Sequence, residues 1–233
     1  PAAALVCNGA DYLCERRYDQ VVFLTTHDSH AVTNYHFTTY AQDKTITEQL
    51  QDGVRGLMWD VYYHQGTAAL CHEPPRIYNC PGGYIDLADA LAELTVFLDA
   101  NPNEVVTIFF ESYITPDGIV DEFTMAGLLD DLFSHRAGQA WPTLGEMATS
   151  GRRLVVFTNN LEEPDGSVQY YTIGANGAWS EARWLHSEWR LAYQTPFEYR
   201  LYSRPGRSPG QDKPGYCAQD RGNGESLYVL NHC

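Results

Sequence analysis

Long apolar runs are absent from this sequence of 233 residues. No stretch approaches the roughly 18 to 20 consecutive apolar residues that a membrane-spanning helix needs, so we expect a soluble protein. Internal repeats and low-complexity tracts are also missing, which argues against a solenoid or a disordered chain. The sequence is 44% hydrophobic and contains 5 Trp, 16 Tyr and 9 Phe. Because that is enough apolar material to bury one large core, we expect a single domain over residues 1–233.

Basic residues are scarce. The chain has 15 Lys and Arg against 30 Asp and Glu, which gives a formal net charge of −15 at pH 7. Nucleic acid is therefore excluded as a partner, because phosphate backbones demand a basic surface. The same charge disfavours electrostatic adhesion to anionic membranes. An acidic surface of this kind keeps a secreted protein in solution.

The Cys-x-x-Cys spacing typical of zinc and redox sites is absent as well. The six cysteines fall instead in three close pairs: Cys7 with Cys14, Cys71 with Cys80, and Cys217 with Cys233. Disulfides persist in oxidising compartments, so the pairs predict an extracellular protein, the alternative being buried free thiols. Six cysteines allow about 15 connectivities. We expect the sequence-local one because short loops cost the least entropy to close. The start at Pro1 rather than Met is typical of a protein whose signal peptide has been removed.

Predicted strands and helices alternate along the first two thirds of the chain. Runs rich in β-branched and aromatic residues predict buried strands at 20–26, 54–62, 67–71, 105–110 and 153–157. One helix is predicted around Ile46 and Leu50, with Gly53 at its C-terminal end. A second is predicted after Asp86, where leucines recur on one face before Asn101 and Pro102. A third is expected around 120–133.

This alternation implies a parallel sheet, in a barrel or in an open doubly wound fold. Polar residues end four of the strands: His27, Asp60, His72 and Glu111. Active sites built from strand C-termini are typical of the top face of a barrel, so we predict a single-domain, distorted TIM-type (β/α) barrel. Its C-terminal half should be less regular, since 169–173 and 227–230 are only weak strand candidates and 203–215 is rich in Pro and Gly.

Histidines and carboxylates at strand ends can supply a general base, a general acid and a site for a hard cation. Cleavage of a phosphodiester needs deprotonation of the attacking hydroxyl, stabilisation of charge on the phosphoryl oxygens and protonation of the departing alkoxide. The residue types at the four strand ends match these tasks. They favour phosphoryl chemistry.

Five stretches of the sequence resemble the X-domain family of phosphoinositide-specific phospholipases C. They are FLTTHDSHAV, ITEQLQDGVRGLMWDVYYHQG, ALCHE, LTVFLDANPNEVVTIFFESY and RRLVVFT, in the family's order. The chain is most similar to the secreted, cysteine-containing PLC-like phosphodiesterases of plants and fungi. The resemblance runs from about Cys7 to Thr158 and fades in the C-terminal third, where only LYVLNH looks like a terminal barrel strand.

The resemblance implies two catalytic histidines. His27 matches the family's general base, which takes the proton from the inositol 2-hydroxyl, and His72 matches the general acid for the diacylglycerol oxygen. The substrate implied is an inositol phospholipid or a soluble inositol phosphodiester, cleaved through a cyclic inositol phosphate. We expect a monomer that touches the membrane surface only transiently.

The resemblance also implies a Ca²⁺ site. Asp28, Asp60 and Glu111 match the ligands of the calcium-dependent members. Calcium-independent bacterial members carry an arginine where this chain has Tyr62, so we expect a metal here and keep Tyr62 as a candidate for substrate binding. Animal enzymes have a second carboxylate at the position of Met58, so Ca²⁺ should bind more weakly in this chain, with water or substrate completing the coordination.

Other roles remain open for some of these residues. Arg55 is a candidate for binding a phosphate, but a salt-bridged arginine is an equal alternative, and Asp60 would then be its structural partner. Glu111 could simply cap the next loop. A zinc site on His27 and His30 lacks a convincing third ligand.

Several other polar and aromatic residues have no assigned role in the predicted site. The remaining histidines are expected on the surface or in loops: His30, His36, His64, His135, His186 and His232. The aromatic cluster formed by Tyr35, His36, Phe37 and Tyr40 either rims the substrate mouth and touches a lipid interface, or packs a loop against the barrel.

Two other functions remain as alternatives to the phospholipase C hypothesis. Glycerophosphodiesterases and sphingomyelinase D-like enzymes use the same barrel, but usually carry Glu-x-Asp on the second strand, where this chain has Met58-Trp59-Asp60. A binding module that has lost catalysis is the alternative from a different class. The presence of both histidines argues against it.

Overall fold

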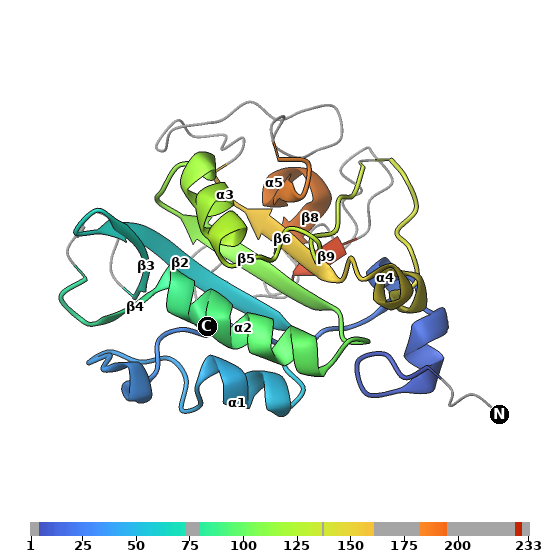
Figure 1. Ribbon diagram of the computed structural model, residues 1–233, viewed down its shortest axis with the longest axis horizontal. Helices are drawn as coiled ribbons and strands as arrows, with labels where there is room; N and C mark the ends of the chain where they lie inside the picture. The colour runs from blue at the N-terminus through green and yellow to red at the C-terminus, as the bar shows by residue number, and fades with distance from the viewer. Residues whose placement is uncertain (1–4, 73–79, 137, 161–181, 195–226, 230–233) are drawn as a thin grey trace, which may run out of the picture.

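The computed structural model describes residues 5–72, 80–136, 138–160, 182–194 and 227–229 (Figure 1). These residues form an α/β structure with a mixed sheet of seven strands. The strands of this sheet are β1 (Thr25–Thr26), β2 (Gly56–His64), β3 (Thr67–Cys71), β4 (Tyr84–Asp86), β5 (Val106–Ser112), β6 (Leu154–Thr158) and β7 (Leu185–Ser187). The helices are α1 (Ile46–Gln51), α2 (Leu87–Ala100), α3 (Pro116–Met125), α4 (Leu144–Ser150) and α5 (Glu188–Leu191).

The strand order is β4-β3-β2-β5-β6-β7, and β1 also pairs with β2. The strands β1, β2, β5, β6 and β7 run parallel, as the alternation predicts. The prediction of a parallel strand is wrong for β3, which pairs antiparallel with β2 because the two strands are joined by a tight turn at Gln65 and Gly66 with no crossover helix. The strand β4, which was not predicted, pairs antiparallel with β3. A separate parallel pair joins β8 (Ala192–Gln194) to β9 (Leu227–Val229). Within the described ranges no strand pairing closes the sheet, so the barrel stays a prediction.

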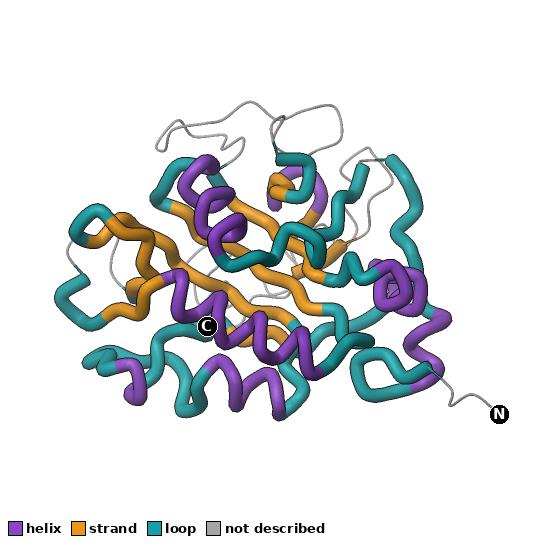
Figure 2. The backbone as a smooth tube through the Cα atoms, in the orientation of Figure 1, coloured by secondary structure: helices purple, strands orange, loops and turns teal. Residues whose placement is uncertain are grey.

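Alternate residues of the strands face two different environments. Leu57, Trp59 and Val61 of β2 are buried in the main core beneath the helices. The helices α1, α2 and α3 lie on this side of the sheet, as Figures 1 and 2 show. The intervening residues of β2 therefore face the other side.

The starts and ends of the helices follow local sequence signals. Thr45 caps α1 in a capping box with Glu48, and Gly53, with φ +97°, follows its end as predicted. The helix expected at 120–133 begins and ends earlier, as α3. Its true start is set by Thr115, whose side chain accepts a hydrogen bond from the Gly118 N–H, and by a proline at the first helical position.

The helix α2 begins directly after Asp86, as predicted, although the Asp86 side chain makes no capping hydrogen bond. Its leucines are buried, and Asn101 follows its last residue. In the described part of the chain, no helix is both long and apolar enough to cross a membrane.

The first predicted strand, 20–26, is largely wrong. Tyr18–Gln20 is a 3₁₀ helix, and only Thr25–Thr26 forms a strand beside β2. Gly56 permits this pairing, because a Cβ at that position would lie 2.2 Å from the Thr25 hydroxyl oxygen. Residues 21–24 belong to no strand, although the Leu24 carbonyl accepts hydrogen bonds from the Arg55 and Gly56 N–H groups.

Two of the three predicted disulfides are confirmed. Cys7 is bonded to Cys14 and Cys71 to Cys80. Both bridges close short loops, as the entropy argument predicts. Cys217 and Cys233 lie outside the described residues.

Candidate active site

The turn after β1 places His27 and Asp28 over the neighbouring strand. The Ser29 N–H and hydroxyl both donate to the Met58 carbonyl of β2. The buried Gln49 amide of α1 donates to the Ser29 carbonyl at 2.8 Å and accepts from the Thr26 hydroxyl at 2.6 Å. Asp28 itself has φ +47°, a conformation that is unusual for a residue other than glycine. The hydrogen bonds on either side maintain this turn.

One oxygen of Asp28 lies between the two predicted histidines. His27 Nδ1 lies 3.1 Å and His72 Nε2 lies 3.3 Å from Asp28 Oδ2. The Asp28 side chain is 6% exposed, and the histidine side chains are 24% and 28% exposed. The fold therefore brings His27 and His72 together around one buried carboxylate.

The two ring nitrogens of His72 face different partners. Its Nδ1 lies 3.1 Å from the Thr39 carbonyl oxygen, which can only accept, so Nδ1 carries a hydrogen. Asp28 is also only an acceptor when ionised. The other ring nitrogen, Nε2, is the atom of His72 that faces Asp28 Oδ2, at 3.3 Å.

Charge around Asp28 shifts two pKa values in opposite directions. The hydrogen bond with Asp28 raises the pKa of His27; burial opposes the shift, and the negative charges of Asp28 and Glu111 add to it. Burial acts to raise the pKa of Asp28, but the hydrogen bond from His27 and the charges of the nearby histidines hold it below its ordinary value. Asp28 is thus ionised at neutral pH, and His27 is a stronger base than an ordinary histidine.

The carboxylates of Asp60 and Glu111 lie side by side, because these residues pair directly in the parallel register of β2 and β5. Burial raises the pKa of Asp60 well above its ordinary value, and the charges of Glu111 and Asp28 raise it further. Three neighbouring carboxylates are the donor chemistry that a hard cation such as Ca²⁺ prefers.

The arrangement of these carboxylates is not that of a formed cation site. In the described ranges, no group of three or more His, Cys, Asp or Glu residues is arranged to hold a metal ion. Asp28 is engaged by both histidines, and Glu111 accepts a hydrogen bond from the Tyr113 hydroxyl. The chemistry fits a cation, whereas the positions would have to change for the three side chains to converge on it.

The non-helical face of β2 and β5 is built in layers along the strands. Met58 pairs in register with Phe109, which is in turn the neighbour of Phe157. This apolar layer lies below the carboxylates. The rings of Tyr62 and Tyr113 stack at 4.3 Å between centroids, with planes 11° apart, one step beyond the carboxylates. Sequence reasoning missed Tyr113, although its position two residues after Glu111 was a usable signal.

Arg55 is not brought to this site. Its Nε donates to Glu104 at 2.6 Å, its Nη1 donates to the Leu50 and Val54 carbonyls, and its guanidinium lies over the Phe97 ring. It precedes β2, at the opposite end of that strand from the polar residues. Arg55 is therefore a salt-bridged structural residue, and neither the proposed phosphate contact nor a pairing with Asp60 is supported.

Two of the predicted surface positions are wrong. His186 lies in β7 and is completely buried, and His64 lies in β2 and is partly buried. His30 and His135 are in loops as expected, but both are buried, and His36 is an exposed loop residue. His232 is outside the described residues.

The aromatic cluster after the first motif mainly packs its loop. Phe37 belongs to the core, and the Tyr35 hydroxyl donates to Glu93. Tyr40 is 51% exposed. The packing alternative therefore accounts for most of this cluster.

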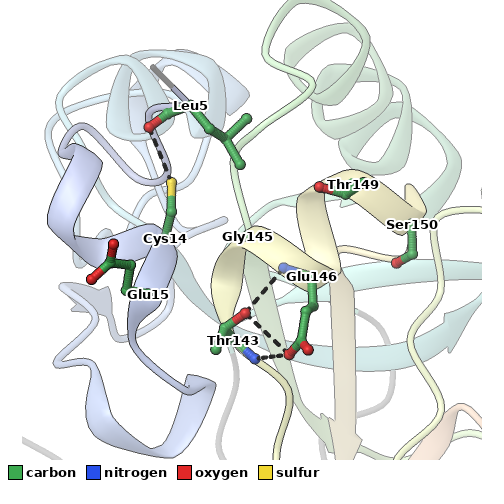
Figure 3. A pocket seen from close by; sticks show the side chains of 8 residues that line it. All are labelled: Leu5, Cys14, Glu15, Thr143, Gly145, Glu146, Thr149 and Ser150. Atoms are coloured by element: carbon green, nitrogen blue, oxygen red, sulfur yellow. Dashed lines mark hydrogen bonds between the residues drawn. The ribbon is translucent and has the colours of Figure 1, made fainter.

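A surface pocket of about 520 Å³ lies elsewhere, between the N-terminal segment and α4 (Figure 3). Thr143 and Glu146 line it, but their side chains already form the capping box of α4. Gly145 packs tightly against Cys14 in the same pocket. Because none of its lining residues belongs to the histidine and carboxylate cluster, we do not assign chemistry to this pocket.

Comparison with known proteins gives one consistent family. The family model described as PI-PLC X matches residues 13–177. A PI-PLC X domain-containing protein from Arabidopsis thaliana is 35% identical over 64% of this chain, which spans only 38% of that protein's length. PI-PLC X domain-containing protein 1 from Arthroderma benhamiae is 32% identical over 99% of this chain and 69% of its own length. The crystal structure of PLC21 from L. pealei is similar in fold, with a TM-score of 0.50 and 16% identity over 71% of this chain and 21% of that chain.

Proposed function

The chain belongs to the PI-PLC X domain family, and on that premise we propose that it is a phospholipase C-like phosphodiesterase acting on inositol phospholipids or related inositol phosphodiesters. The observation that carries the proposal is the placement of His27 and His72 on the same oxygen of Asp28. A general base and a general acid must act on opposite ends of one reacting phosphodiester, so they must lie close together. A non-catalytic module would have no use for this arrangement.

In the proposed reaction, His27 removes the proton of the inositol 2-hydroxyl while that oxygen attacks phosphorus. Its Nδ1–H points to Asp28, so Nε2 is the nitrogen that accepts the proton. The bond from phosphorus to the leaving oxygen breaks, and His72 donates its Nε2 proton to that oxygen. The products are a cyclic inositol phosphate and an alcohol, diacylglycerol in the case of a lipid. Asp28 stabilises the positive charge on whichever histidine is protonated.

We also propose that Ca²⁺ assists the reaction, held by Asp60, Glu111 and Asp28. The unrelieved negative charge at Asp60 supports this proposal. A bound cation would neutralise charge on the phosphoryl oxygens. Since two of the three carboxylates are engaged in other bonds, the affinity should be modest. Chelation with EDTA should abolish turnover, and added Ca²⁺ should restore it; full activity in chelator would remove the metal from the proposal.

The first experiment is a turnover screen. Phosphatidylinositol, its glycan-linked forms, glycerophosphoinositol and sphingomyelin are offered to the protein, and cyclic phosphate is followed by phosphorus NMR. We expect inositol-containing substrates to be cleaved. His27→Ala should lower the rate by about 10²- to 10⁴-fold. The control is His36→Asn, a change at an exposed histidine with φ +66° that Asn tolerates. Cleavage of sphingomyelin alone, or binding without turnover, would contradict the proposal.

We further propose that the protein is secreted and acts as a monomer that meets the membrane only transiently. Its two described disulfides support an oxidising compartment. The net charge of −15 supports weak contact with anionic lipid. Sedimentation of the protein with phosphatidylinositol vesicles, before and after addition of salt, measures the strength of that contact.

A further inference from the structure

Four residues beside the histidines and carboxylates belong to a small cluster that also contains Ala69, and we call these four the aromatic–disulfide wall. It consists of Tyr62, Tyr113, Cys71 and Cys80. Tyr62 is 1% exposed and packs with the buried disulfide, and Tyr113 stacks on Tyr62. The wall belongs to neither of the two larger apolar cores. Because the wall lies beside the predicted catalytic residues, it can affect their positions as well as the stability of the fold.

One side of the wall is connected to His72. Cys71 is the residue directly before His72, at the end of β3, and its bond to Cys80 closes the segment that His72 begins. The Cys80 carbonyl accepts from the Gly83 N–H, and the Gly82 carbonyl accepts from the Thr38 N–H at 2.7 Å.

The same loop contact leads back to the His72 ring. Thr39, the residue after Thr38, supplies the carbonyl that contacts His72 Nδ1 at 3.1 Å. The disulfide therefore constrains His72 in two ways. It fixes the backbone directly before His72, and it holds the loop at Thr38 and Thr39, whose carbonyl contacts the His72 ring.

The other side of the wall is connected to Glu111. The Tyr113 hydroxyl donates to Glu111 Oε1, and the Tyr113 N–H donates to the Val61 carbonyl of β2 at 2.9 Å. Stacking on Tyr62 then restricts rotation of the Tyr113 ring. The same four residues thus constrain the predicted general acid and one predicted carboxylate ligand.

We propose that the aromatic–disulfide wall positions His72 and Glu111 for the reaction, with the Cys71–Cys80 bond and Tyr113 as positioning groups. This inference rests on the proposed function. A proton donor displaced by about 1 Å loses much of its effect even when it is still present, so a rigid backing is needed where the leaving group is a poor one. Neither Tyr113 nor the disulfide takes part in proton transfer in this scheme.

The decisive variant is Cys71→Ala combined with Cys80→Ala. A lipid alkoxide needs a proton from His72 as it leaves, whereas a nitrophenolate does not. We therefore expect a loss of about 10- to 100-fold on phosphatidylinositol and only a small loss on a nitrophenyl ester of inositol phosphate. The matched control is Cys7→Ala combined with Cys14→Ala, which removes the disulfide beside α4. This control should affect the two substrates equally.

A second variant tests the other side of the wall. Tyr113→Phe retains the ring and its stacking but removes the hydrogen bonds of the hydroxyl to Glu111 and to Tyr62. We expect kcat to fall by about 3- to 30-fold with little change in KM, since only the orientation of a reacting-site group is altered. The control is Tyr63→Phe, because Tyr63 is the next tyrosine of β2 and is 45% exposed. Equal effects of the two substitutions would overturn the role of Tyr113.

Crystal structures of the wild type and the variants separate this inference from the proposed function. The distance from His72 Nε2 to Asp28 Oδ2, 3.3 Å here, should lengthen in the Cys71 and Cys80 variant and stay unchanged in the Cys7 and Cys14 variant. An unmoved His72 ring, or equal loss on both substrates, would overturn the inference. A wild type that turns over no inositol phosphodiester would instead defeat the proposed function, and the crystallographic distances would still decide whether the wall positions His72.

Discussion

Two pairs of histidines in this protein have opposite environments. His27 and His72 share a buried carboxylate, Asp28, and remain about one quarter exposed. His135 and His186 are buried, and the His135 N–H donates to His186 Nε2 at 2.9 Å. The first environment raises the pKa of His27 through its bond to Asp28, whereas burial lowers the pKa of His186 to about 3. The partner of a histidine, more than its place at a strand end, therefore decides whether the ring is suited to proton transfer.

The hydrogen bonds of the second pair require a neutral His186. His186 Nδ1 lies 2.9 Å from the Val156 carbonyl, an acceptor, so Nδ1 carries the hydrogen and Nε2 is free to accept from His135. A proton on Nε2 would break that bond. His135 in turn stacks on Trp141 with ring centroids 3.7 Å apart. These contacts join the chain before α4 to β7 and serve the fold.

The largest expected effect comes from removing the carboxylate that distinguishes the first pair. Asp28→Asn should lower turnover by about 10²- to 10⁴-fold, because an amide can accept from one histidine only weakly and cannot stabilise the imidazolium form of either. The thermal midpoint should change little. Rates are measured at saturating Ca²⁺, so that a loss of metal affinity does not contribute. Wild-type turnover in this variant would show that Asp28 does not couple the two histidines.

A smaller effect, on stability instead of activity, is expected at the second pair. His186→Ala should cost about 2 to 4 kcal/mol of unfolding free energy, because it removes a buried ring and leaves two backbone groups without partners. His27→Ala should cost less than about 1 kcal/mol, since that ring is partly exposed. Urea unfolding of both variants provides the comparison. Equal destabilisation by His27→Ala and His186→Ala would contradict the assignment of a structural role to the second pair alone.

The smallest expected effect is a difference in pH dependence. The pKa of His186 is lowered on folding to about 3, so its contribution is fully present above the unfolded value near 6.5 and is lost as the pH falls from there toward 3. Between pH 7 and pH 5 this amounts to about 2 kcal/mol. The acid-induced loss of stability should therefore be smaller by that amount in His186→Ala. An identical pH dependence of the unfolding free energy in the wild type and in His186→Ala would count against a neutral, buried His186.

The raised pKa of His27 has the opposite sign. Its contribution to stability is present below pH 6.5 and is lost as the pH rises through the higher folded value. For the proposed general base, the acid limb of kcat/KM should consequently lie above pH 6.5 in the wild type. In Asp28→Asn this limb should move to lower pH, which a pH–rate profile measures directly.

Sequence patterns predicted the parts of the site that depend on local order. His27, Asp60, His72 and Glu111 were identified because polar residues follow apolar strands, and the parallel pairing of β2 with β5 does place Asp60 beside Glu111. The antiparallel pairing of β3 was not predicted, because a five-residue strand has the same pattern in either direction.

Residues whose partners are distant in the chain were predicted poorly. Arg55 was a candidate for phosphate binding, but its partner Glu104 belongs to a loop that only the folded sheet brings near. His186 has no local feature that marks it as buried, since its two partners come from β6 and from the segment before α4. The contacts of Tyr113 were not predicted, because its stacking partner, Tyr62, lies on another strand.

Residue order alone was enough to identify the family, four of the apolar strands, the end of α1, the start of α2 and the two described disulfides, because each depends on a local pattern or on a short closed loop. The position of one Asp28 oxygen between His27 and His72, in contrast, follows only from the folded arrangement. Protonation, charge and hydrogen bonding depend on distances of about 3 Å between groups that are far apart in the chain. Those distances exist only after the strands have packed side by side.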